Sequence, residues 1–345
     1  MKEELSPILG NHLSQIDLQS LENDQFSFTN ILWQAIGGEL DLSLAGIADM
    51  VMRTFLSELW LNGVLFRQLL IIAILSALIK CLTDSFKSSS IGNVAFYVSY
   101  LIIITIIVSS FRISTGILTD MVGQMTGMME ASVPLMLSLA AMSGNVTGAA
   151  VLNPILFMGI AFMARFIAYV FIPLVTAAAI LHMVDFMAGG DTFSNAIDII
   201  TSGAKTMLKF IIFLFLSLLA LQKVSAPIVN NLALRTARAA AGAVPMVGGA
   251  LNSAMDTVLN LSAAARSGVL VALIIVIALA SAVPLLKLFS FMFVYKLVAA
   301  VIQPICDERI VKCLDGLGDY VGMLFYAGLL VSIMFVFTAV IMLSF

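Results

Sequence analysis

Long apolar runs alternate with short polar stretches along the chain from residue 64 to the C-terminus. A helix needs about 20 apolar residues to cross a hydrocarbon core about 30 Å thick. The runs therefore predict an all-α polytopic membrane protein with about seven or eight transmembrane helices. The predicted membrane segments are 64–79, 94–111, 149–187, 204–221, the pair 269–286 and 289–302, and 320–345. Segment 115–143 is ambiguous, because it contains Asp120 and Glu130 as well as many Met and Gly residues.

Prolines interrupt three of these segments. Proline has no backbone N–H and its ring clashes with the preceding helical turn, so it kinks or ends a helix. Pro134, Pro173 and Pro284 are therefore predicted helix breaks. Segment 149–187 has 39 residues, which is about 58 Å of helix at 1.5 Å per residue. It either crosses the membrane twice or crosses once as a tilted, kinked helix.

An acidic region precedes the membrane segments. Residues 1–60 contain nine acidic and two basic residues, whereas the rest of the chain contains 11 acidic and 15 basic residues. Apolar side chains within 44–60 recur every three or four positions, which predicts an amphipathic helix. We therefore divide the chain into an acidic extracytoplasmic head, 1–61, and a multipass transmembrane domain, 62–345. Anionic lipid headgroups would repel the head, so its helix is expected to rest on a protein neighbour or on the bundle.

The distribution of basic residues predicts the orientation, because basic residues in short loops mark the cytoplasmic side. The basic segment 223–266 and the loop with Lys80 and Lys87 are assigned to the cytoplasm, and the base-free segment 188–203 to the outside. This assignment requires two crossings within 115–187. It also predicts an extracytoplasmic N-terminus.

Proline-containing dipeptides recur at one spacing. Pro134 and Pro245 are 111 residues apart, as are Pro173 and Pro284. At this spacing, two halves of the chain repeat the order of a span, a Pro-broken polar segment and a long apolar pair. With the orientation above, the halves form an inverted repeat, as in many transporters; the alternative is coincidence among the spacings of eight prolines. The two halves are 94–187 and 204–304.

Composition excludes several classes of protein. The chain is 61% hydrophobic and 11% charged, whereas a soluble domain has about 25% charged residues. This excludes a soluble globular protein, a disordered chain and a nucleic-acid-binding protein. We find no nucleotide-binding loop, zinc-protease motif or Ser/His/Asp arrangement, so we expect no enzymatic activity, no catalytic residue and no cofactor.

The histidines offer little chemistry. His12 and His182 are the two histidines of the chain, too few for a metal cluster, so no metal site is predicted. His182 and Asp185 are three residues apart and could meet on one helix face. They would form either a proton relay or a polar pair at a helix end.

Charged residues inside apolar runs are the strongest site candidates. An ionisable group at membrane depth costs at least about 2.5–3.5 kcal/mol, so it usually faces the bundle or water. Arg165 and Lys296 fit this description best. Segments 125–154 and 234–258 are too polar to face lipid, and we interpret them as re-entrant halves of a solute pathway. The candidate pathway residues are Arg165, Arg235, Arg238, Pro245, Gly248, Gly249, Asp256 and Lys296.

The charge of Lys296 needs a partner at this depth. Asp256 or the C-terminus of a helix could stabilise it. The competing interpretation is that Arg235 and Arg238 only mark the cytoplasmic side, and that Lys296 extends its amine to the membrane surface.

Several short motifs in the C-terminal third form a specific set. They are Leu234 to Ala237 (LRTA), Val244 to Gly249 (VPMVGG), Asp256 to Val258 (DTV), Tyr295 to Pro304 (YKLVAAVIQP) and Cys313 to Asp315 (CLD). With these motifs, and with the order of its apolar segments over about 45–345, the chain resembles the stage III sporulation protein AE family of endospore-forming bacteria.

The resemblance implies a multipass protein of the mother-cell membrane that surrounds the forespore. It implies partnership with ring-forming subunits, a secretion-type ATPase and a forespore-side protein of a secretion-like complex. The implied role is a permease-like component of a feeding channel that forespore development needs. The alternatives are a non-conducting membrane scaffold that assembles the complex, or a secondary transporter of an unknown solute.

Overall fold

A computed structural model describes residues 44–85, 89–142, 146–188, 192–242 and 280–344, with a few positions between 274 and 278. These residues form helices and include no strand, which confirms the predicted all-α fold. Most of the predicted acidic head lies outside the described residues. So do four candidate pathway residues, Pro245, Gly248, Gly249 and Asp256.

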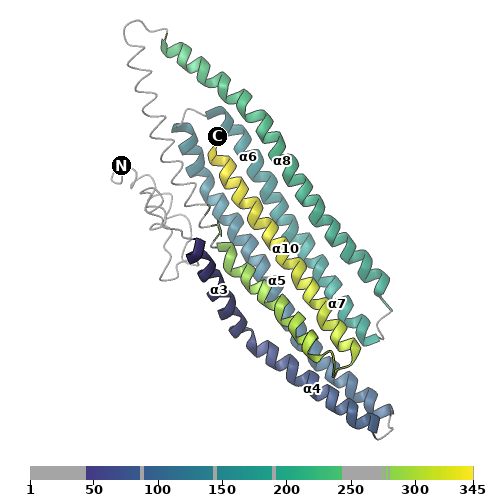
Figure 1. The fold of residues 1–345 in the computed structure, drawn as a ribbon. Coiled ribbons are helices and arrows are strands. Elements are labelled where there is room, and N and C mark those ends of the chain that lie inside the picture. Colours follow the sequence, from purple (N-terminus) through teal and green to yellow (C-terminus); the bar gives the residue numbers. More distant parts are fainter. Residues whose placement is uncertain are drawn as a thin grey trace.

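The helices form an elongated bundle in which successive helices run up and down one axis (Figure 1). In chain order they are α3 (Leu44–Leu61), α4 (Gly63–Ser85), α5 (Ser89–Met142), α6 (Val146–Phe166), the π-turn η1 (Ile167–Phe171), α7 (Ile172–Ala188), α8 (Ser194–Gly242), the helix Ala280–Ile302 and α10 (Glu308–Ser344).

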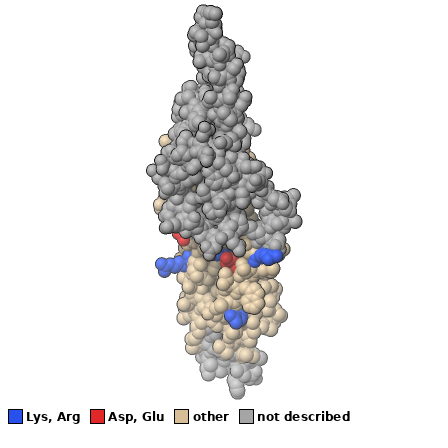
Figure 2. Space-filling model, turned by 90° about the vertical axis from the view of Figure 1, so that its left-hand side faces the viewer, with Lys and Arg blue, Asp and Glu red and all other residues tan. Residues whose placement is uncertain are grey.

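Five of the described helices are long and apolar enough to cross a membrane, and a bent pair adds a sixth candidate. The bent pair turns by 45° between Met52–Leu61 and Gly63–Leu78. From the side on which α3 and α4 lie, the described surface carries only scattered charged residues (Figure 2). The five spans are Tyr100–Glu130, Ile155–Met187, Ser194–Leu221, Ala280–Ile302 and Glu308–Val340. The described part of the chain is therefore a polytopic membrane protein.

The amphipathic helix predicted at 44–60 is α3, and its end is held by the bundle. Phe55 packs against Phe289, with ring centroids 5.3 Å apart. Glu58 is buried, and its Oε1 lies 3.9 Å from Lys287 Nζ. At the junction with α4, the Asn62 side chain donates a hydrogen bond of 3.0 Å to the Ser290 hydroxyl. Helix Ala280–Ile302 therefore carries the docking site for α3.

Helix α5 joins two segments that the sequence pattern separates, 94–111 and 115–143. The residues between them are polar but compatible with a helix, because their hydroxyl groups bond to their own backbone. Ser114 donates to the Ser110 carbonyl at 3.1 Å, and Thr115 donates to the Arg112 carbonyl at 2.9 Å. The described part of segment 125–154 is likewise helical: it comprises the end of α5 and the start of α6.

The described part of segment 149–187 is one continuous helical segment, long and apolar enough to cross a membrane once. The π-turn Ile167–Phe171 precedes Pro173, and the N–H of Ile172 bonds to the carbonyl of Ile167, five residues earlier. The wider turn accommodates Pro173, which cannot donate a backbone hydrogen bond, and the helix continues as α7. Pro134 and Pro284 also lie within helical residues. The helix continues past each of the three prolines.

These continuous helices change the predicted orientation. Three long passes, α5, α6–α7 and α8, separate residue 89 from residue 242, where the parity argument requires four crossings. The ends of α4 and α7 therefore lie at one end of the bundle, and the C-terminal end of α8 lies at the other (Figure 1). Since α5 and α8 run in the same direction, the described parts of the two halves are not inverted copies. The physical reason is helix continuity: α5 joins two predicted segments, and the π-turn keeps α6 and α7 in one helical segment.

Helix α10 forms the centre of the bundle. It packs on α5, α6, α7 and α8, and 56% of an 18-residue stretch of its span is buried, against 17% of such a stretch in the α8 span. Its glycines receive side chains from three neighbouring helices. Gly316 faces the His182 ring of α7, while Gly318 and Gly322 face Lys296 and Met292. Small residues of this kind let membrane helices approach closely.

Topology can be tested by cysteine labelling from outside intact cells, in a chain whose native cysteines have been replaced. Ser89→Cys and Thr192→Cys should be modified from the same side, and Gly242→Cys from the opposite side, because α8 crosses between the last two. Modification of Thr192→Cys and Gly242→Cys from one side would contradict the arrangement of α8.

Helix packing around α10 gives a second prediction. Gly316→Ala should lower the free energy of unfolding by about 1–3 kcal/mol, because the added Cβ collides with the His182 imidazole. Thermal unfolding in detergent measures this, and His182→Ala in the same chain should restore stability. Gly203→Ala is the matched control: its Cβ meets nothing within 4 Å, so helix propensity should raise stability by up to about 1 kcal/mol. Equal melting temperatures for Gly316→Ala and the wild type would refute the close contact.

Candidate functional site

Lys296 lies in an ion cluster with two aspartates of α10. Its Nζ is 2.8 Å from an Oδ1 of Asp315 and 2.8 Å from an Oδ1 of Asp319. The two carboxylates are one helical turn apart. Between them Gly318 leaves room for the aliphatic part of Lys296, whose carbons lie 3.0–3.1 Å from where a Cβ would stand. The partners of Lys296 are therefore Asp315 and Asp319, while the predicted partner Asp256 lies outside the described residues.

Arg165 is also paired. Its guanidinium donates to Glu130 Oε1 at 2.8 Å, joining α6 to the end of the α5 span. The two side chains are 60% and 49% exposed, so this pair lies on the surface of the bundle and not in an enclosed cavity. Arg235 and Arg238 belong to the C-terminal part of α8. The structure therefore does not bring Arg165 and Lys296 into one site.

His182 and Asp185 have separate partners. The His182 ring packs edge-on against Phe186 and Tyr320, with centroids 4.8 and 5.4 Å away. Asp185 is buried, and its Oδ1 accepts the backbone N–H of Phe193 at 2.6 Å. The Tyr320 hydroxyl lies 3.3 Å from Thr201 Oγ1. These contacts join α7, α8 and α10 at one end of the bundle, which favours the structural interpretation over a proton relay.

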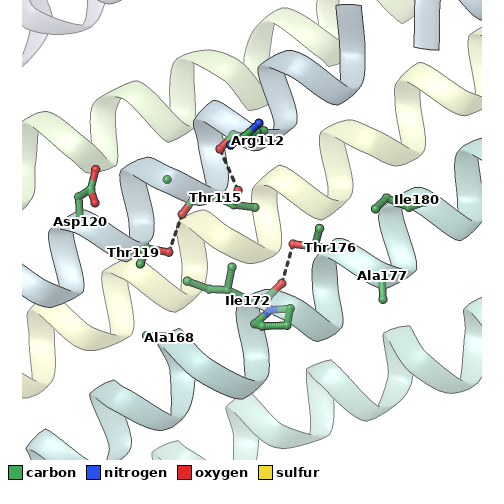
Figure 3. Close-up of a pocket in the computed structure, with 11 residues that line it drawn as sticks. Arg112, Thr115, Thr119, Asp120, Ala168, Ile172, Thr176, Ala177 and Ile180 are labelled. Atoms are coloured by element: carbon green, nitrogen blue, oxygen red, sulfur yellow. Dashed lines mark hydrogen bonds between the residues drawn. The ribbon is translucent and has the colours of Figure 1, made fainter. Parts of the chain in front are cut away.

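A groove between α5 and α7 brings together polar groups that the sequence analysis did not select (Figure 3). Its volume is about 670 Å³ and it is open to the side of the bundle. Helix α5 contributes Arg112, Thr115, Gly116, Thr119 and Asp120, the π-turn contributes Ala168, and α7 contributes Ile172, Pro173, Thr176, Ala177 and Ile180.

Three threonine hydroxyls line this groove. Each donates to a carbonyl of its own helix: Thr115 to Arg112, Thr119 to Thr115, and Thr176 to Ile172, at 2.8–2.9 Å. Because the proton of each hydroxyl is used in this way, the oxygen keeps lone pairs that can accept hydrogen bonds from a molecule in the groove.

Arg112 and Asp120 add two charges within the candidate membrane span Tyr100–Glu130. They lie 12 residues after Tyr100 and ten residues before Glu130 along the same helix. Both side chains are exposed, and neither forms an ion pair with another described residue. Lipid solvates such charges poorly, so this surface contacts water or another protein segment.

The apolar pattern predicts a span that ends at residue 111, and Arg112 falls between that span and the next segment. The spacing of polar residues and glycines along the sequence is the signal that predicts this surface. Arg112, Gly116, Asp120, Gly123 and Gly127 recur every three or four residues, the spacing of one continuous polar face on a single helix.

Comparison with known proteins adds the family. The family model described as stage III sporulation protein AE matches residues 26–345. The chain belongs to this family. The resemblance inferred from the C-terminal motifs is therefore confirmed, and the chain is a membrane protein of a sporulation family.

The stage III sporulation protein AE of Bacillus subtilis (strain 168) is similar along nearly the whole chain. It is 27% identical over 341 residues, which cover 94% of this chain and 86% of that relative. No solved structure matches the chain.

The Lys296 cluster yields a testable contribution to stability. Lys296→Met should lower the free energy of unfolding by about 1 kcal/mol, because it removes two partly exposed ion pairs and leaves two carboxylates one turn apart. Lys296→Arg should retain most of the stability. Thermal unfolding in detergent measures both.

A third variant separates charge from packing. Asp315→Asn and Asp319→Asn added to Lys296→Met should recover part of the lost stability, because no like charges then remain in the cluster. If Lys296→Met melts at the wild-type temperature, the cluster does not stabilise α10 against its neighbour.

Proposed function

We propose that this chain is the permease-like membrane component of a sporulation-specific channel between mother cell and forespore, and that the α5–α7 groove is one wall of its solute pathway. The observation that carries the proposal is the pair of charges, Arg112 and Asp120, exposed near the middle of a span beside three hydroxyl groups. A polar surface at this depth suits a hydrated path better than a lipid-facing wall.

The groove could interact with small polar solutes along its length. Arg112 and Asp120 are eight residues apart, or about 12 Å along the helix. Between them the threonine oxygens offer acceptors, and Arg112 offers donors that can bind an anionic group. The opposite wall would come from another protein chain, because the groove is open to the side.

The alternative function is a scaffold that conducts nothing. The broad exposed surface of α8 favours it, since only 17% of that span is buried within the chain. Under either function we propose the same surroundings: the mother-cell membrane around the forespore, ring-forming subunits, a secretion-type ATPase and a forespore-side partner.

Filling the groove distinguishes conduction from scaffolding. Thr176→Phe and Ala177→Phe each place a ring in the groove, from the α7 side. We expect normal membrane levels and normal co-purification of the other complex subunits, but a severe loss of heat-resistant spores, because the path is blocked while the outer faces of α8 are unchanged. Spore counts after heating, together with pull-downs, measure both effects.

Ile333→Phe is the matched control, since Ile333 is exposed on α10 and does not line the groove. It should leave spore counts unchanged. Normal spore counts in both groove variants would refute a conducting groove. Loss of co-purification with the other subunits would instead assign the surface of α7 to assembly.

A further inference from the structure

We propose that copies of this chain assemble side by side in a ring, with the polar face of α5 in one copy packed against the charged flank of α8 in the next. The inference goes beyond the proposed channel function, because it concerns the neighbour that covers the groove and does not depend on what the groove conducts.

The polar face of α5 consists of Arg112, Gly116, Asp120, Gly123 and Gly127. All are at least partly exposed, and a Cβ added at any of the three glycines would meet nothing within 4 Å. The helix therefore presents a surface of two charges and three open notches inside its membrane span, Tyr100–Glu130. Close packing of a second helix would use the notches, and opposite charges on that helix would neutralise Arg112 and Asp120.

The charged flank of α8 consists of Asp198, Lys205 and Lys209. All three side chains are exposed, and all three lie in the span Ser194–Leu221. Asp198 and Lys209 are 11 residues apart, about three helical turns, so they lie on one line along the helix. None of the three forms an ion pair with another described residue.

Contacts with α10 show where each of the two surfaces lies along the axis of the bundle, which we call its height. Thr201 of α8 touches Tyr320, and Leu118 of α5 touches Gly328, eight residues further along α10. Lys209 is also eight residues beyond Thr201. It therefore lies level with Leu118 and within about 3 Å of the height of Asp120.

The second charge pair matches as well. The hydroxyl groups of Ser110 and Tyr295 are in contact, and the neighbouring Lys296 lies on Gly318. Arg112 is therefore close to the height of Tyr320, and Asp198 is three residues, or about 5 Å, below that level. The long side chain of Arg112 can span such a difference.

The signs of these charges and the common direction of α5 and α8 then determine how two copies can associate. Helices α5 and α8 run in the same direction (Figure 1), and rotation about the membrane normal keeps every residue at its depth. A neighbouring copy can therefore place Lys209 opposite Asp120 and Asp198 opposite Arg112. A two-fold contact of α5 with α5 would instead put Arg112 near a second Arg112, and Asp120 near a second Asp120.

The geometry also permits the contact to repeat. Helix α5 packs on α4, α6, α7 and α10, whereas α8 packs on α6, α7 and α10, so other helices separate the two surfaces within one copy. A contact between two different surfaces generates a ring when the rotation closes. In such a ring the α8 of the neighbour covers the open side of the groove.

Cross-linking tests the contact in membranes of a host that makes only this chain. One tagged copy carries Asp120→Cys and a differently tagged copy carries Lys209→Cys, both with the native cysteines replaced by alanine. A short bismaleimide should produce a dimer that contains both tags. One chain with both substitutions should produce a ladder of higher species.

Charge reversal provides a second test of the contact. In native mass spectrometry, Asp120→Lys alone should reduce the oligomer at least tenfold relative to the monomer, equal to about 1.4 kcal/mol. Adding Lys209→Asp should restore it. The matched control for cross-linking is Tyr326→Cys with Lys209→Cys, because Tyr326 is exposed near the same height on another helix; it should give no dimer.

Four results would overturn the ring: a monomer in both assays, cross-links between two Asp120→Cys copies in place of the mixed pair, equal cross-linking by Tyr326→Cys, or cross-links to a different protein only. Neither assay measures transport, so failure of the ring would leave the channel proposal standing. If the ring forms but the groove variants still produce normal spore counts, only the conduction proposal is refuted.

Discussion

Close packing around α10 is the contact on which the other helices depend. An apolar helix gains little by leaving lipid for protein, so association in a membrane rests on close approach and on polar contacts. The glycines of α10 provide the close approach, with Gly316 facing α7 and with Gly318 and Gly322 facing helix Ala280–Ile302. Lys296, Asp315 and Asp319 provide a polar contact at the same place. Helix α3 then docks on the outer side of Ala280–Ile302 through Phe55 and Glu58.

A second constraint explains why the helices are so long. Within lipid, each polar group needs a partner inside the protein, and the hydroxyls of α5 find one in the preceding helical turn. Proline at position 173 is accommodated in the same local way, by a π-turn with a bond from Ile172 to Ile167. Local satisfaction keeps each helix continuous, and continuity fixes the number of crossings. The common direction of α5 and α8 follows from it.

Charges divide into two groups by whether the chain itself neutralises them. Arg165 and Lys296, the strongest candidates from sequence, are paired within the chain. Arg112 and Asp120 also lie inside a candidate span, but they form no ion pair with another described residue. Because an uncompensated charge at that depth is costly, the second group is the better guide to what the chain contacts. The groove and the flank of α8 are therefore the surfaces where this sporulation protein meets solute, water or a further copy.

The sequence alone determined the membrane class, the apolar segments, the amphipathic helix at 44–60 and the family, because each depends on composition, helical period or a short motif. It did not determine where helices end. Pro173 and the polar residues after Phe111 predict breaks, whereas the tertiary structure has a π-turn and hydroxyl–backbone bonds at these places. The partners of charges also came only from the structure: Asp315 and Asp319 are 19 and 23 residues from Lys296, and what brings them together is the packing of α10. Span ends and ion pairs depend on which helices are neighbours, and that is decided by contacts between residues far apart in the chain.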